Sequence, residues 1–287
     1  MMYTAKIENK NGAVYVLTGN EPVYQVIDIT GLNPPPAQIN TTPIVGLDGA
    51  LFNSSRLDTR NIVLTIKING DVEKNRLALY QAFRTKEWCR FYYTNGTLDV
   101  YIDGYVETVE CGLFTNDEQA QISILCPSPY FRSLEEIIDD ISSVTAKFTF
   151  PFDINVNQPI PISEFRIADT TNVINSSSAE TGMIIEIDVL ASIYDIEIRN
   201  VITGDRFMLG GNYQAGDKII IDTNKGQKSV KLVRDGITTN ILSKIARGSV
   251  FFQLQPGDNF FGFLIDLGDN NQNVYITIKH FNAYRGV

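Results

Sequence analysis

The feature that most constrains the fold is an alternation of side-chain character along the segment Ile62–Gly70. Large aliphatic residues occupy every second position from Ile62 to Ile68, and the positions between and after them hold Val63, Thr65, Lys67 and Asn69. Because successive side chains of a β-strand point to opposite faces of the sheet, this period of two predicts a strand with one buried face. Phe91–Tyr93 and Leu98–Ile102 are predicted strands that flank Asn95-Gly96, a pair suited to a tight hairpin turn, and Gln119–Leu125 is a further predicted strand.

The second half of the chain consists almost entirely of short strand-like segments separated by turns. Turn pairs such as Asp235-Gly236 and Pro256-Gly257 recur at intervals of roughly 8–12 residues, which is typical of a β-sandwich. A chain of 287 residues with 44% hydrophobic residues is long enough for two cores. We therefore expect a mainly β protein with two unlike domains. The strands predicted in the second half are Ile184–Leu190, Asp195–Val201, Lys218–Asp222, Ser229–Val233, Ser249–Leu254, Asn259–Leu267 and Val274–Phe281.

Two segments have helical spacing instead. Asp71 is suited to cap a helix that runs to about Lys86, with Leu79 among the residues of its apolar side. Ser133–Glu136 has the pattern of a capping box, and Leu134, Ile137, Ile138 and Ile141 follow at helical intervals. This pattern predicts a short helix between the domains. The predicted division is a first domain at residues 1–131, a linker with the short helix at 132–150, and a second domain at 151–287.

The segment Thr30–Gly49 contains four prolines and little periodicity, so it is predicted to be a long loop. Proline-rich segments stay extended at low entropic cost. Two interpretations are equally open from the residues alone: an arm that reaches a neighbouring subunit, or an ordinary surface loop. The candidate inter-subunit residues are Pro34, Pro35, Pro36 and Pro43.

Residues suited to catalysis are scarce. The single histidine, His280, is expected at the edge of a core, and Cys89, Cys111 and Cys126 have no zinc-site spacing and are expected as buried thiols. Phosphate-binding glycine motifs are missing. Asp222–Gly226 resembles the start of a calcium loop but lacks its full acidic series, so a hairpin turn is expected there, and the acid and amide cluster Gly268–Asn273 is expected to be a solvated turn. We therefore expect no cofactor and no metal ion, and we predict that the protein is not an enzyme.

The charge pattern also excludes some roles. The 33 acidic and 24 basic residues give a net charge of −9. The sequence contains no cluster of basic residues of the kind that binds nucleic acid, which argues against a nucleic-acid-binding role. No stretch approaches the ~20 apolar residues that span a bilayer, and the N-terminal residues lack the pattern of a secretory signal. We expect the chain to be folded in a cytosol and to have no membrane anchor.

Four aromatic residues of the second half occur in adjacent pairs at Phe251-Phe252 and Phe260-Phe261. Neighbouring residues of a strand face opposite sides, so one ring of each pair is expected at the outer face. We interpret the outer rings first as interface residues. The alternative is a platform for a saccharide.

Three groups of motifs, in a fixed order along the chain, then suggest a family. Together they resemble the distal tail proteins of long, flexible-tailed bacteriophages, and they cover nearly the whole chain. Ser128 departs from this pattern, because an acidic residue is expected between the two prolines. The first group is Gly46–Gly49, Phe52–Arg56, Arg60–Leu64 and Arg76–Tyr80; the second is Ile124–Phe131; the third is Gly216–Thr223, Gly226, Lys228–Val230, Asp235-Gly236, Leu254–Asn259 and Tyr284–Val287.

This resemblance implies a specific architecture and role. The first domain would be a tail-tube-like β-sandwich with one helix, and six copies would close into a ring at the distal end of the tail. The ring would join the tail tube protein to the tail-tip hub or tail-associated lysin protein, and DNA would pass through its lumen. The second domain would be a galectin-like or carbohydrate-module-like sandwich that faces outward and docks a receptor-binding protein or decorates the tail. The alternative function is a carbohydrate-binding accessory protein of the virion that contacts host cell-wall polysaccharide. In either case the protein would be assembled in the bacterial cytoplasm and would end up in the virion.

Overall fold

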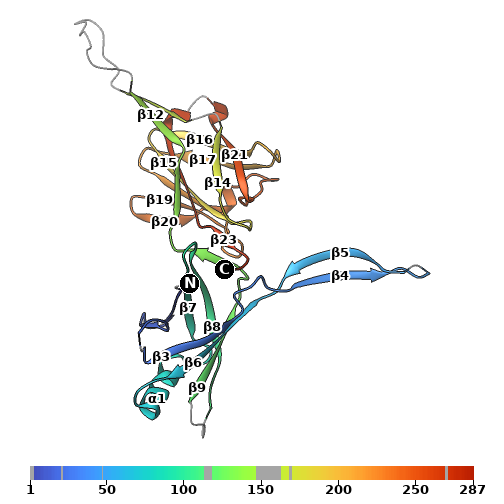
Figure 1. Ribbon diagram of the computed structural model, residues 1–287. Helices are drawn as coiled ribbons and strands as arrows, with labels where there is room; N and C mark the ends of the chain where they lie inside the picture. The colour runs from blue at the N-terminus through green and yellow to red at the C-terminus, as the bar shows by residue number, and fades with distance from the viewer. Residues whose placement is uncertain are drawn as a thin grey trace, which may run out of the picture. The chain divides into compact units, whose positions relative to one another are not determined.

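A computed structural model of the chain describes residues 3–20, 22–46, 48–112, 118–146, 163–167, 170–268 and 271–287. The chain forms two compact units (Figure 1). Unit 1 comprises Met1–Leu134 together with Ala283–Val287, and unit 2 comprises Glu135–Asn282. From Glu135 onward the region expected as a linker is therefore part of unit 2, with residues 147–150 outside the described part. The last five residues return to unit 1.

Unit 1 is built on one antiparallel sheet whose main path runs β2-β1-β7-β8-β9-β6-β3. The predicted strand Ile62–Gly70 is confirmed, since Ile62, Leu64, Ile66 and Ile68 are all buried in β6. The turn at Asn95-Gly96 joins β7 to β8 as predicted. The strands are β1 (Thr4–Asn9), β2 (Val14–Val16), β3 (Tyr24–Thr30), β6 (Arg60–Ile68), β7 (Trp88–Thr94), β8 (Asp99–Cys111), β9 (Gln119–Cys126), β10 (Phe131–Ser133) and β23 (Ala283–Tyr284).

One helix, α1 (Val72–Ala82), packs on the apolar face of this sheet. The carboxylate of Asp71 accepts a hydrogen bond from the backbone N–H of Lys74 at 3.3 Å, which is the predicted cap. Leu79 and Phe83 are buried in the same cluster as the apolar residues of β6. The helix ends before the predicted Lys86, whose positive φ of 72° is incompatible with a continuing helix.

Unit 2 is a β-sandwich. One sheet has the order β11-β22-β15-β18-β19-β20 and the other has the order β14-β21-β16-β17. Apolar residues of the two sheets form a single core. The strands are β11 (Ile137–Asp140), β14 (Thr171–Asn175), β15 (Met183–Val189), β16 (Ile193–Asn200), β17 (Arg206–Tyr213), β18 (Lys218–Asp222), β19 (Ser229–Arg234), β20 (Ile237–Asn240), β21 (Gly257–Ile265) and β22 (Val274–His280), with a separate pair β12 (Ser142–Ala146) and β13 (Ser163–Ile167) and the 3-10 turns η1 (Leu242–Lys244), η2 (Asp266–Gly268) and η3 (Asn271–Asn273).

The prediction of a short helix after Ser133 is wrong. The residues that follow Leu134 form strand β11, in which Ile137 pairs with His280 and Asp140 pairs with Thr277 of β22. β-Branched isoleucines fit a pleated surface well, and the ladder with β22 outweighs the local capping pattern. The isoleucines have helical spacing, but their pairing with β22 determines the structure of this segment.

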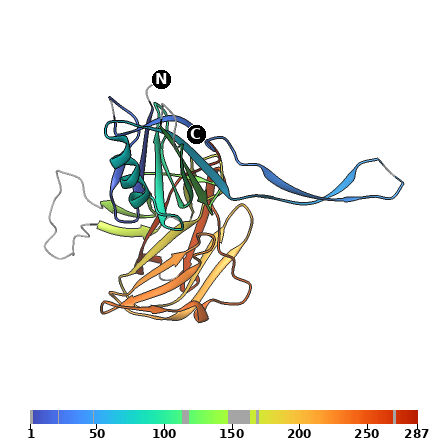
Figure 2. The same cartoon turned by 90° about the horizontal axis from the view of Figure 1, so that it is seen from below.

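The predicted loop Thr30–Gly49 is also wrong in its main part. Strands β4 (Ala37–Pro43) and β5 (Ala50–Leu57) form a two-stranded antiparallel sheet that pairs with no other described strand. This hairpin, which we call the arm, projects from the rest of unit 1 (Figures 1 and 2). Pro34, Pro35 and Pro36 lie before its first strand, and Pro43 ends that strand.

Candidate functional site

The single histidine and two of the three cysteines are buried. The His280 side chain is fully buried, with its Nε2 3.5 Å from Oδ2 of Asp139, and burial lowers the pKa of the imidazole. Burial raises the pKa of the thiols of Cys89 and Cys126 to about 12, so both are protonated at neutral pH and inert. In this part of the chain no group of three or more His, Cys, Asp or Glu residues is placed to hold a metal ion.

The acidic turn after β18 is a hairpin turn, as predicted. Oδ1 of Asp222 accepts hydrogen bonds from the backbone N–H and the side-chain amide of Asn224, at 2.9 and 2.8 Å. Both bonds close the turn locally, through one oxygen of its single carboxylate. The other acidic turn, Gly268–Asn273, includes residues 269 and 270, which lie outside the described residues.

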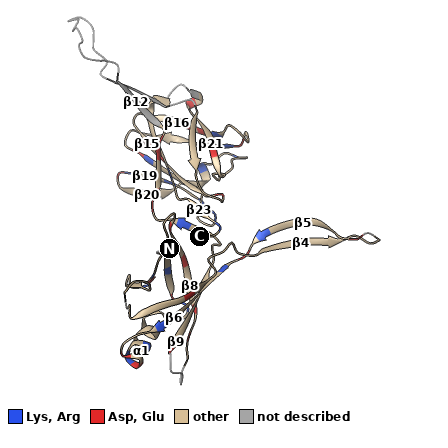
Figure 3. Ribbon diagram, in the orientation of Figure 1, with Lys and Arg blue, Asp and Glu red and all other residues tan. Residues whose placement is uncertain are grey.

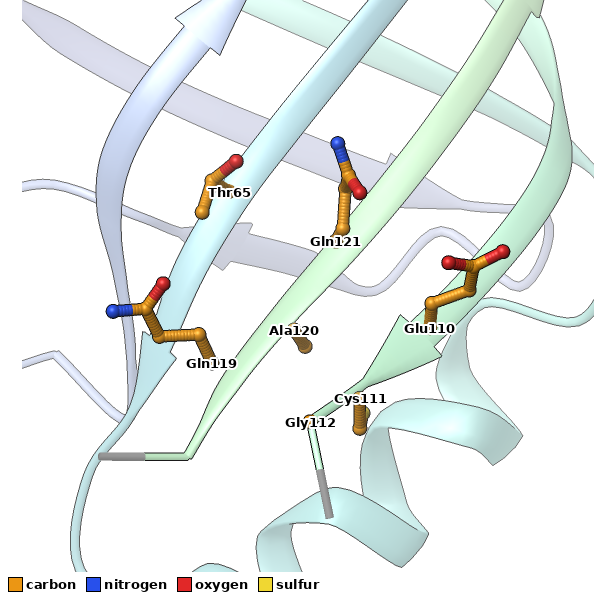
Figure 4. Close-up of a pocket in the computed structure, with 7 residues that line it drawn as sticks. All are labelled: Thr65, Glu110, Cys111, Gly112, Gln119, Ala120 and Gln121. Atoms are coloured by element: carbon orange, nitrogen blue, oxygen red, sulfur yellow. The ribbon is translucent and has the colours of Figure 1, made fainter. Parts of the chain in front are cut away.

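An open hollow of about 560 Å³ lies at the end of β8 and β9 in unit 1 (Figure 4). Its polar lining includes the carboxylate of Glu110 and the amides of Gln119 and Gln121. The side chain of Cys111 points to the opposite side of β8, toward α1, and is partly exposed instead of buried as predicted (Figure 4). The hollow thus offers hydrogen-bonding groups and one carboxylate. A general base paired with a nucleophile is not among these lining residues.

Among the described residues, no helix is both long enough and apolar enough to cross a lipid bilayer. Acidic and basic residues are interspersed on the described parts of both units (Figure 3).

The arm is the most exposed element of unit 1. Every residue of β4 is exposed, and so is every residue of β5 except Leu57, which is partly buried. Residues 37–57 contain only two charged residues, Asp48 and Arg56. An isolated two-stranded hairpin is only marginally stable in water, so an arm of this kind is typical of a segment that is covered in an assembly.

The register of the arm separates its side chains into two different faces. Cross-strand partners share a face, and the faces alternate along the strands. One face carries the pairs Ala37–Leu57, Ile39–Ser55, Thr41–Phe52 and Pro43–Ala50, and we call it the apolar face. The other, the polar face, carries Gln38–Arg56, Asn40–Ser54 and Thr42–Leu51.

Side-chain hydrogen bonds on the arm follow this division. Asn40 donates to Ser54 at 3.0 Å, Asn53 donates to Thr42 at 2.6 Å, and Arg56 donates to Gln38 at 2.8 and 3.0 Å. All of these partners belong to the polar face or to the bulge at Asn53. On the apolar face, Ile39 is 63% exposed and Phe52 is 61% exposed. The arm is therefore an amphipathic hairpin whose polar side is internally satisfied and whose apolar side is uncovered.

The predicted outer-face aromatic residues of unit 2 have different environments. Phe252 and Phe261 are buried in the sandwich core, with ring centroids 5.6 Å apart. Phe251 is half-buried and meets Phe207 edge-on at 5.1 Å. Phe260 is 37% exposed.

The two phenylalanine pairs therefore behave differently. In β21 the expected alternation holds, with Phe261 facing inward and Phe260 outward. The segment Ser249–Leu254 is not the predicted strand, since only Leu254 forms an isolated bridge, and without strand alternation both Phe251 and Phe252 contact core residues.

Sequence reasoning missed the residues that make the arm distinctive, Ile39 and Phe52. A short signal was present, because Ala37 and Ile39 alternate with the amides Gln38 and Asn40. The four prolines of Thr30–Gly49 outweigh this short alternation and favour a loop, and in β5 the extra residue Asn53 forms a bulge that interrupts the strand pattern. The role of the four candidate prolines as inter-subunit contacts stays a prediction.

Comparison with known proteins gives one match in sequence. Residues 176–284, within unit 2, match the family model described as the siphovirus-type tail component, C-terminal domain. No curated protein matches the chain in sequence.

Solved structures extend the likeness to the whole chain. The crystal structure of the Dit protein of phage SPP1, described as a paradigm of the hub adsorption apparatus in phages that infect Gram-positive bacteria, has a TM-score of 0.70 at 13% identity and covers 99% of each chain. The activated baseplate of phage p2 with Ca gives a TM-score of 0.53 at 12% identity and covers 100% of each chain. The same baseplate with Sr gives 0.53 at 12%, covering 97% of this chain and 98% of that one.

At these identities the solved structures establish a common fold. The mainly β architecture expected from the sequence is confirmed, and the resemblance to the siphovirus-type family is confirmed by the sequence match. Residues 176–284 of unit 2 are thus similar in sequence to the C-terminal domain of siphovirus-type tail components, and the whole chain shares the fold of the SPP1 Dit protein.

Proposed function

We propose that this protein is a structural subunit of a phage tail tip, and that copies of it close into a hexameric ring. The ring joins the tail tube protein to the tail-tip hub or tail-associated lysin protein at the distal end of the virion tail. The protein acts by assembly rather than by catalysis. Folding and assembly take place in the cytoplasm of the bacterial host.

The observation that carries this proposal is the arm. A ring needs a heterologous interface, in which one patch of a subunit binds a different patch of the next subunit. An amphipathic hairpin that extends from unit 1 supplies the first of these patches, because its apolar face requires a cover. The family match of unit 2 and the common fold with the SPP1 Dit protein support a second copy of this chain as that cover.

The charge of the chain suits a ring through which DNA passes. The net charge of −9 is spread over both units, and a surface of this kind repels a polyanion instead of holding it. Unit 2 supplies the outward surface for a receptor-binding protein or a decoration component.

The mass of the purified protein in solution, combined with low-resolution images of the particles, tests the proposal. We expect a mass of six chains and images of a ring with a central hole. The matched variant replaces residues 37–57 by Gly-Ser-Gly, a closure that the arm allows because Ala37 and Leu57 are paired neighbours. This variant should remain folded and monomeric. A folded variant that still forms the same ring would refute the role of the arm.

A second candidate function is binding of host cell-wall polysaccharide, and exposed Phe260 favours it. Its cross-strand neighbour Asn172 donates a hydrogen bond to Asp258 at 2.7 Å, so an aromatic surface lies beside amide and carboxylate groups. This function predicts that the full chain is retained on isolated cell-wall polysaccharide and that Phe260→Ala abolishes the retention. Equal retention of both proteins would exclude Phe260 as the platform.

A further inference from the structure

Arg60, the first residue of β6, is the most deeply buried cation that the structure describes. Arg60 is 2% exposed, and its guanidinium carbon lies 4.6 Å from the ring centroid of Phe131. Burial lowers the pKa of the guanidinium from its usual value. A cation in such a place is stabilised only where every donor is satisfied.

All five N–H groups of this guanidinium are used. Nε donates to the carbonyl oxygen of Pro129 at 2.9 Å, and Nη2 donates to the same oxygen at 2.8 Å and to the carbonyl of Arg285. Nη1 donates to the carbonyl of Asn33 at 2.7 Å and to that of Gly31. Only arginine offers five donors in a rigid planar fork, so this arrangement is specific to the residue type.

The four acceptors come from three segments that lie far apart in the sequence. Gly31 and Asn33 belong to the stretch that leads from β3 into the arm. Pro129 lies between β9 and β10, just before the chain leaves unit 1 for unit 2. Arg285 lies in the tail Ala283–Val287, where the chain has returned to unit 1.

The tail adds its own contacts to the base of the arm. The backbone N–H of Val287 donates to the carbonyl of Leu32 at 3.2 Å. A Cβ atom on Gly286 would approach Cδ of Pro34 to 2.8 Å, so the two backbones pack without room for a side chain. The residues from Gly31 to Pro34 are thus held between Arg60 on one side and the tail on the other.

We propose that Arg60 is the positioning residue of the arm. It fixes the direction in which the arm leaves unit 1, and it makes this direction depend on both segments that connect unit 1 with unit 2. A strain applied through either connection reaches the carbonyl groups that Arg60 holds, and through them the base of the arm. One consequence of this proposal, that a fixed arm is oriented to bind the next subunit, rests on the proposed function.

Spin-label distance measurements on the full chain test this inference. One pair of labels, at Thr42→Cys on the polar face of the arm and Thr97→Cys in the β7–β8 turn, reports the direction of the arm. A reference pair, at Lys10→Cys and Thr97→Cys, reports the sheet alone. Cys111→Ser removes the partly exposed thiol, and dilution into unlabelled chain keeps the distances within one molecule.

The test variant is Arg60→Lys, which keeps the charge but cannot reach four carbonyl groups at once. We expect the arm–sheet distance distribution to widen by at least about twofold while the reference distribution is unchanged. Arg206→Lys, at an exposed position of unit 2, is the matched control and should leave both unchanged. An unchanged arm distribution in a folded Arg60→Lys protein would overturn the proposal, and so would equal widening of both distributions.

A second variant keeps the inference testable if Arg60→Lys does not fold. Removal of Val287 alone leaves Arg60 and its four acceptors in place, including the amide carbonyl of Arg285, but deletes the backbone hydrogen bond from Val287 to Leu32. The arm distribution should widen less than in Arg60→Lys, and no widening would count against the proposal. If the unaltered chain forms no ring and the arm still loosens in these variants, Arg60 positions the arm and the ring proposal fails separately.

Discussion

The two faces of the arm allow a sharp test of the proposed ring. Phe52 lies on the apolar face and is 61% exposed, and the adjacent Leu51 lies on the polar face and is 58% exposed. Both are large apolar residues of the same strand, and both contribute little to the stability of a single chain. We therefore compare Phe52→Ser with Leu51→Ser.

The size of the expected effect follows from the exposed area. A phenylalanine side chain buries about 150–250 Å² when it is fully covered. With 61% of Phe52 exposed, a neighbouring subunit would cover about 120 Å² more, which at roughly 25 cal/mol per Å² stabilises each interface by about 3 kcal/mol. Since every 1.4 kcal/mol changes an equilibrium constant about tenfold, Phe52→Ser should weaken each interface by about a hundredfold.

Native mass spectrometry across a range of protein concentrations measures this effect as a shift of the concentration at which rings form. We expect a shift of about a hundredfold for Phe52→Ser and less than about threefold for Leu51→Ser. Thermal melts at concentrations below those at which rings form should show that both variants are within about 0.5 kcal/mol of the parent protein. Equal shifts for the two variants, or no shift for Phe52→Ser, would refute burial of the apolar face.

Two further predictions concern the stability of the units. Asp217 in unit 2 is 3% exposed and accepts hydrogen bonds from both Nε and Nη2 of Arg234, which lower its pKa, so Asp217→Asn should destabilise unit 2 by about 2 kcal/mol in chemical denaturation at neutral pH. The pKa of Asp217 is lower in the folded than in the unfolded protein, so the stabilisation by the ion pair is complete above about pH 4 and is lost as the pH falls through the folded pKa. The difference in unfolding free energy between the parent and Asp217→Asn should therefore shrink in acid. A difference that does not depend on pH would contradict a stabilising ion pair. Gly31 has a φ of 87° and a Cβ there would overlap the carbonyl oxygen of Asn61, so Gly31→Ala should lower the melting temperature of unit 1 far more than Gly49→Ala, where φ is 96° but nothing lies within 4 Å. Equal melting temperatures for the two alanine variants would show that the base of the arm relaxes freely.

Much of the fold could be predicted from the sequence because its strands are amphipathic. The alternation in β6 and the turn between β7 and β8 depend on neighbours in the chain, so local patterns indicate them correctly. The cap of α1 by Asp71 is local in the same way. Each of these features is determined by residues within one element or one turn.

The two failures have different causes, and the first is tertiary pairing. Ile137 and Ile138 have helical spacing, but strand β22 offers them a ladder of hydrogen bonds that an isolated helix does not outweigh. The first strand of the arm lies in a segment with four prolines and only a short alternation, so the sequence predicts a loop there, although the strand pairs with its near neighbour β5. The isoleucines are thus decided by a strand that is distant in the sequence, whereas the arm is a local hairpin whose pattern is too short to recognise.

Arg60 is the extreme example of this limit. An arginine at the start of a strand is ordinarily a surface residue, and nothing beside it in the sequence suggests five buried hydrogen bonds. One of its acceptors, the carbonyl of Arg285, is 225 residues away along the chain. Backbone carbonyls exist at every residue, so the sequence carries no record of which ones will converge. A residue that positions the arm through backbone atoms of distant segments is therefore visible only in the folded protein, whereas the strands that bring those segments together can be read from their own side chains.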